Sequence, residues 1–255
     1  MNFIKSVLMI SISLILIGCK SKIIDDGAIV AAEKLYEDGI TKLGQADYKQ
    51  AAVDFEKVFF QHPGNRITPY AELMQAYSLY KAGEYEEAID VINIFIKLHP
   101  RHIDIAYAYY LKSLASYVQI TEVKLDQSRT EHALASLNEV IARFPKSKYA
   151  IDAELKIDLV KDHLAGKEMF VGHYYLKKRN PIAAIKRFQS VIEKYNTSSH
   201  TPEALYRLIE SNLMLGLVSE AEKYGEVLSY NYQGSIWFDQ GRNLLKKYNV
   251  TKASD

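Results

Sequence analysis

An interval of 12 residues between an alanine and a proline recurs along this chain and constrains its fold more than any other feature of the sequence. It occurs in three places: Ala51 to Pro63, Ala88 to Pro100 and Ala133 to Pro145. Proline cannot continue a helix, and a small side chain lets two helices approach closely. Each interval therefore predicts a helix that packs closely at its alanine and ends before its proline.

Two further alanines keep the spacing without the proline. Ala184 and Ala221 precede Asn196 and Gln233 by the same 12 residues. The residues four positions after the five alanines are Phe55, Ile92, Leu137, Phe188 and Gly225. Four of these five side chains are large and apolar and lie one helical turn beyond the alanine. The sequence thus predicts five similar units, with less certain ends for the fourth and fifth.

The segment from Tyr70 to Pro100 contains one complete unit. Its alanines and proline, Ala76, Ala88 and Pro100, follow at 12-residue intervals and match the end of the tetratricopeptide repeat (TPR) pattern. Gly83 lies between the two expected helices and permits the positive φ that a tight turn needs. One hairpin cannot bury its apolar stripe alone. The predicted fold class is therefore all-α, a right-handed solenoid of five TPR helical hairpins.

Two intervals between units are longer than the 37 residues that separate Ala51 from Ala88. Ala88 and Ala133 are 45 residues apart, and we assign the extra eight to a surface loop within 119–129. Ala133 and Ala184 are 51 residues apart. The surplus of this last interval is close to four helical turns at about 3.6 residues per turn, so a helix lengthened by that amount keeps its apolar face in phase.

The proline-free segment 147–178 is the place for this lengthened helix. Ser147 is its expected N-cap, and either Gly166 or Gly172 would be the point of any bend. The prediction is one long helix that joins repeats three and four.

The N-terminal residues have the pattern of an export signal. Lys5 precedes an apolar run over residues 7–17, which is shorter than the roughly 20 residues of a membrane-spanning helix. The run ends in Leu16-Ile17-Gly18-Cys19, which resembles the bacterial lipobox. This resemblance implies that the chain is cut before Cys19 and that Cys19 is acylated, while Lys20 favours sorting to the outer membrane. The alternative is an ordinary signal peptide with a chance cysteine.

These observations give a division of the chain. It comprises a lipoprotein signal peptide (1–18), a lipidated tether (19–31), repeats one to three (32–146), the long helix with repeats four and five (147–250) and a tail (251–255). Cys19 is the single cysteine of the sequence, so no internal disulfide forms. We expect attachment to the outer membrane by lipid, on its periplasmic face.

Several classes of function lack their usual residues. The 32 Lys and Arg residues against 31 Asp and Glu residues leave no basic excess for nucleic acid. No nucleotide loop, Gly-x-Ser-x-Gly elbow or His-Glu-x-x-His motif is present, so we expect no enzyme activity, cofactor or metal. His99 and His102 flank Pro100, and we expect both on the surface. A short basic run, 177–179, is expected to be a solvated helix end.

Two sets of residues are candidates for binding a partner. Tyr70, Leu73, Tyr77 and Tyr80 follow one helix stripe at intervals of three or four. This stripe either lines the inner groove of the solenoid or packs on the neighbouring helix. Arg187 precedes Phe188 and is expected at the border of the packed face, where it covers apolar surface or binds a partner's carboxylate.

Further residues carry a resemblance over essentially the whole mature chain. They are the run 144–150 (Phe-Pro-Lys-Ser-Lys-Tyr-Ala), Asp152, Ala153, Leu164, Ala165, Glu168, Tyr174, Tyr175, Ala183, Ala184, Arg187, Tyr195, Ala204, Leu205 and the run 215–217. With the lipobox and the five repeats, this pattern resembles the BamD (ComL) family of outer-membrane assembly lipoproteins. Asn196 and Gln233 depart from the prolines expected in that family.

The resemblance implies a non-catalytic subunit of the machine that inserts β-barrel proteins into the outer membrane. Its implied partners are the POTRA domains of the barrel subunit BamA, other assembly lipoproteins and unfolded barrel substrates. The C-terminal repeats would bind BamA, with Arg187 near the contact, and the N-terminal repeats would receive substrate. Another TPR lipoprotein, such as a secretin pilot or a cell-wall coordinator, is the alternative. A periplasmic enzyme would need a further domain, and no unassigned segment is long enough.

Overall fold

The computed structural model describes residues 30–252, with side chains up to residue 248, and the regular structure of this part is helical throughout. Its eleven helices are α1 (Ala32–Gly44), α2 (Tyr48–Gln61), α3 (Thr68–Ala82), α4 (Tyr85–Leu98), α5 (Ile105–Tyr117), α6 (Ser128–Arg143), α7 (Lys148–Lys177), α8 (Pro181–Lys194), α9 (Thr201–Met214), α10 (Val218–Asn231) and α11 (Ile236–Lys252). The all-α prediction is confirmed for these residues.

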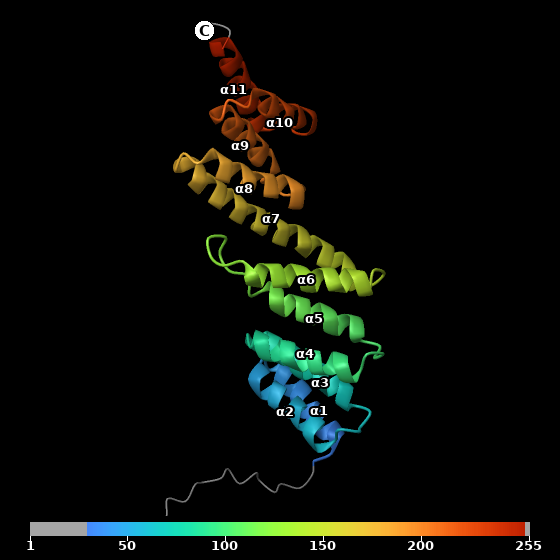
Figure 1. Ribbon diagram of the computed structural model, residues 1–255. Helices are drawn as coiled ribbons and strands as arrows, with labels where there is room; N and C mark the ends of the chain where they lie inside the picture. Colours follow the sequence, from blue (N-terminus) through green and yellow to red (C-terminus); the bar gives the residue numbers. More distant parts are fainter. Residues whose placement is uncertain (1–29, 253–255) are drawn as a thin grey trace, which may run out of the picture.

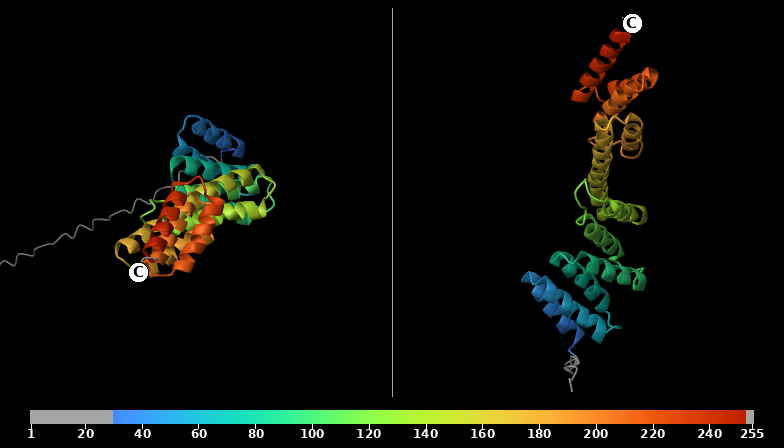
Figure 2. Two further views of the ribbon diagram at one scale, coloured as in Figure 1. Left: turned by 90° about the horizontal axis from the view of Figure 1, so that it is seen from above. Right: turned by 60° about the vertical axis from the view of Figure 1, so that its left-hand side comes forward.

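Successive helices form hairpins that stack into an elongated array (Figure 1). The pairs are α1 with α2, α3 with α4, α5 with α6, α7 with α8 and α9 with α10. Figure 2 shows the same stack from two further directions. The eleventh helix, α11, packs on α9 and α10 at the end of the stack. The repeat pattern did not single out α11, and this helix includes residues 251 and 252 of the expected tail.

The alanines that define the repeats lie inside the hairpins. Ala51, Ala88, Ala133, Ala184 and Ala221 each have an exposed fraction of 0%. The large side chains one turn on, Phe55, Ile92, Leu137 and Phe188, are also fully buried. Burying one such side chain contributes about 1.5–3 kcal/mol, so these positions form the centre of each unit.

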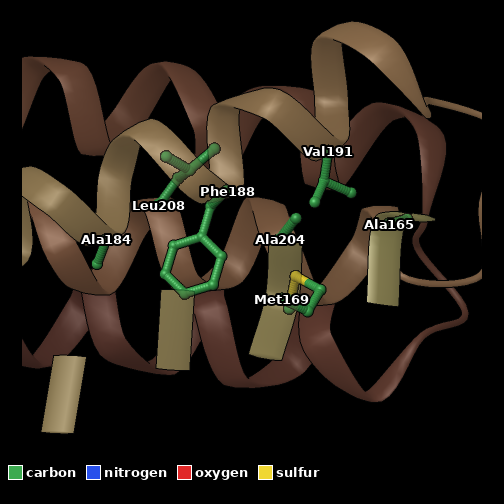
Figure 3. Close-up of a cluster of buried hydrophobic side chains, with 7 residues drawn as sticks. All are labelled: Ala165, Met169, Ala184, Phe188, Val191, Ala204 and Leu208. Atoms are coloured by element: carbon green, nitrogen blue, oxygen red, sulfur yellow. The ribbon is translucent and has the colours of Figure 1, made fainter. Parts of the chain in front are cut away.

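Two hairpins close by packing a phenylalanine ring directly on a glycine of the preceding helix. Phe55 meets Gly39 and Phe188 meets Gly172, with the same separation in sequence for both pairs. A Cβ atom at Gly172 would lie 2.3 Å from the Phe188 ring, and one at Gly39 would lie 2.7 Å from the Phe55 ring. Figure 3 shows Phe188 in its cluster of buried side chains between α7, α8 and α9.

The last hairpin exchanges the sizes of the two side chains. Ile209 stands at the glycine position of α9, and Gly225 stands at the phenylalanine position of α10. Leu245 of α11 fills the space beside Gly225, where a Cβ atom would lie 2.7 Å from it. Gly225, the exception among the five positions, is therefore the place where the final helix packs.

Helix α7 is the long helix expected between repeats three and four. It spans 30 residues without a break at Gly166 or Gly172, which at 1.5 Å per residue is about 45 Å. The side chain of Ser147 accepts a hydrogen bond from the backbone N–H of Ala150 (3.2 Å), which confirms the N-cap. The first half of α7 packs on α6 and the second half packs on α8. The two glycines serve close packing instead of a bend.

The second helices of all five hairpins end at the same point, whether or not a proline follows. Each ends two residues before the proline position, and its C-cap residue is a histidine or an aromatic residue: His62, His99, Phe144, Tyr195 and Tyr232. The carbonyl group of each cap accepts a hydrogen bond from the backbone N–H three residues later. This turn stops the helix without proline, so Asn196 and Gln233 leave the fourth and fifth ends unchanged.

The loop after α5 is not the simple surface loop that its composition predicts. It covers 118–127 and folds back onto α7, where Lys167 donates hydrogen bonds to the carbonyl groups of Lys124 (2.8 Å) and Leu125 (2.9 Å). The buried amide of Gln127 donates to three carbonyl groups of the same loop. The loop thereby braces the middle of the solenoid.

The contact between Gly172 and Phe188 generates a stability prediction. Gly172→Ala places a methyl group against the buried ring, so we expect a loss of about 1–3 kcal/mol in the free energy of unfolding, measured by urea denaturation. Gly44→Ala is the matched control because no atom lies within 4 Å of the added Cβ. Equal midpoints for the two variants would contradict the packing described for α7 and α8.

Candidate binding surfaces

The first helices of the hairpins form the inner layer of the solenoid. Helices α1, α3, α5 and α7 contact one another in turn, whereas α2, α4 and α6 are spaced further apart within the described chain. Helices that converge on one side of a curved stack lie on its concave side. A binding surface on the inner face must therefore come from side chains of these first helices.

Six tyrosines from three of these helices gather into one surface, which we call the tyrosine face. Its members are Tyr77 and Tyr80 of α3, Tyr107, Tyr110 and Tyr117 of α5, and Tyr149 of α7. All six are half-buried, with their rings packed on the cores of the second and third repeats. They leave an aromatic surface that runs across three successive hairpins.

Direct contacts hold the tyrosine face together. The ring centroids of Tyr110 and Tyr149 lie 5.0 Å apart in a stacked arrangement, and those of Tyr107 and Tyr149 lie 5.7 Å apart. Such aromatic pairs contribute about 0.5–1.5 kcal/mol beyond their buried area. Burial raises the pKa of Tyr107, with smaller effects from Tyr77, Tyr149 and Tyr80. The ring contacts of Tyr149 therefore join α5 to α7 within the face.

One carboxylate anchors the face to the long helix. The hydroxyl of Tyr110 donates to Asp152 of α7 at 2.5 Å, and Lys156 pairs with the same carboxylate at 2.7 Å. The hydrogen bond from Lys156 and then that from Tyr110 lower the pKa of Asp152. Burial and the bond to Asp152 raise the pKa of Tyr110. The first turns of α7 therefore fix one edge of the face.

Two lysines of α7 flank the rings of this face, and Lys81 of α3 lies over a ring outside it. Lys156 lies 5.8 Å from the ring centroid of Tyr117, and Lys148 lies 5.2 Å from that of Tyr149. Lys81, next to Tyr80 in the sequence, lies 5.6 Å from the ring of Tyr48. An ammonium group over an aromatic ring is attracted by the ring electrons. The face therefore combines aromatic surface with positive charge, which suits an apolar segment that carries a carboxylate.

The stripe predicted on α3 divides between the core and this face. Leu73 is only 5% exposed and belongs to the core between α3, α4 and α5, as in the alternative of helix packing. Tyr77 and Tyr80 pack on the same core and are also members of the tyrosine face. Tyr70 is 42% exposed, and its ring lies 4.9 Å from that of His102. Tyr70, Tyr77 and Tyr80 therefore have surface that a ligand can reach.

The contribution of α5 and α7 to this surface was missed from the sequence, although a signal for it was present. Tyr107, Tyr110 and Tyr117 follow Tyr70, Leu73 and Tyr80 at the same basic repeat length that separates Ala51 from Ala88. Applying the repeat length to the stripe on α3 would have placed the second row. Tyr149 had no such signal, because the longer loop after α5 shifts the period before α7 begins.

The expectation of two surface histidines is wrong. The side chains of His99 and His102 are 26% and 13% exposed and pack around Phe95. Nε2 of His99 lies 3.1 Å from Oε2 of Glu72, a carboxylate buried in α3. Burial raises the pKa of Glu72, and the neighbouring His99 opposes that shift. The ring centroids of His99 and His102 lie 6.4 Å apart, so Pro100 did not prevent the two histidines from approaching.

Arg187 lies at the border of the packed face, as expected from the sequence. Its side chain is 43% exposed, and Nη1 lies 3.3 Å from Oε2 of Glu168 on α7. The guanidinium therefore keeps further donors for another carboxylate. This geometry leaves room for a carboxylate from a partner.

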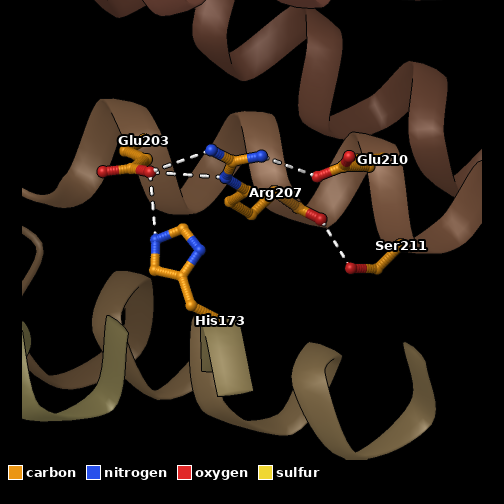
Figure 4. A network of polar contacts seen from close by, with 5 residues as sticks. All are labelled: His173, Glu203, Arg207, Glu210 and Ser211. Carbon is orange, nitrogen blue, oxygen red and sulfur yellow. Dashed lines mark hydrogen bonds and ion pairs between the residues drawn. The ribbon is translucent and has the colours of Figure 1, made fainter. Parts of the chain in front are cut away.

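A second charged group, absent from the sequence prediction, joins α7 to α9 (Figure 4). Glu203 pairs with Nε2 of His173 at 3.1 Å and with Nη2 of Arg207 at 3.3 Å. Nη1 of Arg207 also binds Glu210 at 2.9 Å, and its guanidinium lies over Trp237 of α11. Burial raises the pKa of Glu203, but His173 and Arg207 outweigh it and the net shift is downward. These ion pairs brace the C-terminal repeats.

Comparison with known proteins decides the family. A family model described as "Outer membrane lipoprotein" (YfiO) matches residues 30–228. The outer membrane protein assembly factor BamD of Rickettsia prowazekii is 56% identical over 237 residues, which cover 93% of this chain and 94% of that protein. BamD of Caulobacter vibrioides is 45% identical over 213 residues, or 84% of this chain and 70% of that protein. The chain belongs to the BamD family.

Solved structures of other repeat proteins align with this BamD-family chain at lower sequence identity than the relatives above. The TPR2AB domain of yeast Sti1 has a TM-score of 0.44 at 14% identity, covering 86% of each chain. The MamA protein has a TM-score of 0.39 at 20% identity, covering 77% of this chain and 89% of that one. At these identities the likeness concerns the fold alone.

Membership of this family makes the protein an outer membrane lipoprotein. Its predicted lipidation site, Cys19, lies outside the described residues. Among residues 30–252, no helix is long and apolar enough to span a bilayer. The same residues contain no group of three or more His, Cys, Asp or Glu side chains arranged to hold a metal ion.

The bond between Tyr110 and Asp152 predicts a pH-dependent stability in this BamD-family protein. Tyr110→Phe removes the hydroxyl, and at pH 7 we expect a loss of about 1 kcal/mol, because partial exposure of Asp152 screens the stronger charged bond. Because the pKa of Asp152 is lower in the folded than in the unfolded protein, its carboxylate stabilises the fold above about pH 4. This stabilisation is lost as the pH falls through the pKa of Asp152 in the folded protein.

The difference between wild type and Tyr110→Phe in urea midpoint should therefore be greatest near pH 7 and should decrease as the pH falls below about 4. Tyr109→Phe is the control, since the Tyr109 ring packs on Phe144 outside the tyrosine face. A difference that persists unchanged at pH 3 would show that the carboxylate does not receive this bond.

Proposed function

We propose that this protein is the non-catalytic subunit of an outer membrane assembly machine in which the tyrosine face receives unfolded β-barrel segments and the C-terminal repeats dock BamA. The observation that supports the proposal most strongly is the aromatic surface with flanking lysines on α3, α5 and α7. Membership of the BamD family, whose relatives are named assembly factors, gives the process in which such a surface would act.

The chemistry of the tyrosine face suits the ends of barrel proteins. A barrel strand alternates apolar and polar residues, and its last residue in these substrates is aromatic and carries the terminal carboxylate. Tyrosine rings offer apolar surface together with hydroxyl groups that bind backbone. The ammonium group of Lys148 stands beside the Tyr149 ring and offers charge to the carboxylate, whereas that of Lys156 is already paired with Asp152. Recognition therefore needs no fixed sequence beyond an aromatic end and an alternating strand.

Arg187 is the proposed contact for BamA. Its guanidinium is only partly engaged by Glu168, at 3.3 and 3.5 Å, so a carboxylate of a POTRA domain can bind the remaining donors. The ion pairs among His173, Glu203 and Arg207 hold α7 and α9 in place on the same part of the chain. Other assembly lipoproteins are further proposed partners within the same complex.

The anchor is proposed to be the acylated Cys19. Twelve peptide units separate Cys19 from Ala31, the residue before α1, and fully extended they reach at most roughly 40 Å. Several acyl chains on one residue give a firm attachment to a bilayer, whereas a single chain is marginal. The solenoid would then work on the periplasmic face of the outer membrane within that distance of the anchor.

Photo-crosslinking from single positions tests the division of the surface. A crosslinker at Tyr77 should capture unfolded barrel peptides, and one at Lys186, beside Arg187, should capture BamA. Tyr230 of α10 is 86% exposed and serves as the control position outside both surfaces. Capture of the same partner from Tyr77 and Lys186, or no capture from either with a native circular dichroism spectrum, would refute the division.

Charge reversal tests the role of Arg187 separately. Arg187→Glu should weaken recovery of BamA in a detergent pull-down by about tenfold or more, because it sets two carboxylates against each other and repels the partner. Arg187→Lys keeps the charge without the planar fork, so its recovery should lie between wild type and Arg187→Glu. Wild-type recovery from Arg187→Glu would remove this residue from the interface.

Mass spectrometry of the mature protein tests the anchor. We expect an N-terminal peptide that begins at Cys19 and carries the mass of fatty acyl groups. The variant Cys19→Ala should retain the signal peptide and carry no fatty acyl mass. An unmodified Cys19, or a retained signal in the wild type, would contradict the lipobox interpretation.

A further inference from the structure

Helix α7 carries three large apolar side chains that nothing in the described structure covers. Ile151, Leu155 and Leu159 are 66%, 64% and 61% exposed and follow one another at intervals of four residues. Side chains four apart form one ridge on a helix. We call these three residues the α7 ridge. Its length is about 12 Å at 1.5 Å per residue.

The α7 ridge lies on the same side of α7 as the residues that pack on α8, about four helical turns before them. The counterparts of Ile151 and Leu155 are Ala165 and Met169, two residues of the buried cluster with α8. The counterpart of Leu159 is His173, whose ring contacts Phe188 of α8. Because nearly a whole number of turns separates the two sets, each ridge residue points to the same side of α7 as its downstream counterpart.

Helix α8 is too short to cover both copies of this face. It has 14 residues against the 30 of α7, and it ends at Lys194. The loop after it crosses α7 at Asp162, which accepts a hydrogen bond from the backbone N–H of Ser199 (2.7 Å). Figure 1 shows α8 beside only the later part of α7. The earlier part therefore presents a helix-packing face without a helix.

The charges around the α7 ridge are acidic. Glu154 and Asp158 lie between its members and are exposed, and no ion pair joins either of them to a described residue. Lys156 also lies between them but pairs with Asp152 at 2.7 Å, which leaves Lys161 as one cation against these two carboxylates. Lys148, at the start of α7, holds its ammonium 5.2 Å from the ring of Tyr149. An occupant of the ridge therefore gains from positive charge beside its apolar residues.

We propose that the α7 ridge is a docking site for one amphipathic helix of a partner protein, with apolar residues at intervals of four on its contact face and lysine or arginine at the border. Ridges of i±4 spacing accept the matching ridges of a second helix, as α8 does further along α7. The site includes neither Arg187 nor any member of the tyrosine face. The partner's helix would lie on the first half of α7 in the way that α8 lies on the second half.

Peptide binding to the purified full-length protein in detergent tests this proposal. The probe is a fluorescent peptide of about 18 residues, long enough to form a helix, with leucines at intervals of four and lysines beside them. Its matched control carries glutamates in place of the lysines. We expect the lysine peptide to bind about tenfold or more tightly than the glutamate peptide, as measured by fluorescence anisotropy.

Variants locate the binding on α7. The double variant Leu155→Ala with Leu159→Ala keeps helix-forming residues and should weaken binding of the lysine peptide about tenfold. Ile236→Ala, at an apolar residue 65% exposed on α11, should leave binding unchanged. Circular dichroism confirms the fold of each variant.

Three results would overturn the proposal. They are equal binding of the lysine and glutamate peptides, unchanged binding by the double alanine variant, and a dimer of the full-length protein in sedimentation that the double variant abolishes. The last result would assign the ridge to a second copy of this chain.

Discussion

The contact of a large side chain with a glycine or alanine of the neighbouring helix sets the geometry of the whole stack. Phe188 lies on Gly172 and Phe55 lies on Gly39, both at distances that exclude a Cβ atom. Close approach at these points brings the rest of each helix pair into contact, and each pair then offers its outer faces to the next. Since a single hairpin cannot bury its apolar residues, stability grows only as the pairs stack.

The added length of α7 separates the two proposed binding surfaces of this stack. Its first turns carry Tyr149 and Asp152, which complete the tyrosine face, and its last turns carry Glu168 and His173, which bind Arg187 and Glu203. Because the insertion is close to a whole number of turns, α7 packs on α6 at one end and on α8 at the other. One rigid element therefore sets the distance between the two proposed binding surfaces.

Much of this architecture could be predicted from the local pattern of the sequence, whereas the contacts between residues far apart in the chain could not. The five alanines, the ends of the second helices and the Ser147 cap were predictable because each depends on residues at fixed short intervals. The ion pairs of Glu203 and the reach of Lys167 across 43 residues to the loop before α6 form only after the hairpins stack, so no periodic pattern marks them. Leu73 and the α7 ridge show what apolar spacing leaves open. The spacing predicts burial for both, but Leu73 is buried because a neighbouring helix covers it, whereas no described helix covers the ridge.

The two proposed binding surfaces depend on the continuity of α7, and a proline within it is the most direct test. Lys161→Pro breaks the helix between those surfaces at a cost of about 3 kcal/mol or more, while Lys161→Ala keeps it. We predict that brief proteolysis leaves wild type and Lys161→Ala uncut within 148–177 and splits Lys161→Pro into an N-terminal and a C-terminal half. Cleavage of the wild type within α7, or full resistance of Lys161→Pro, would contradict a continuous, rigid helix.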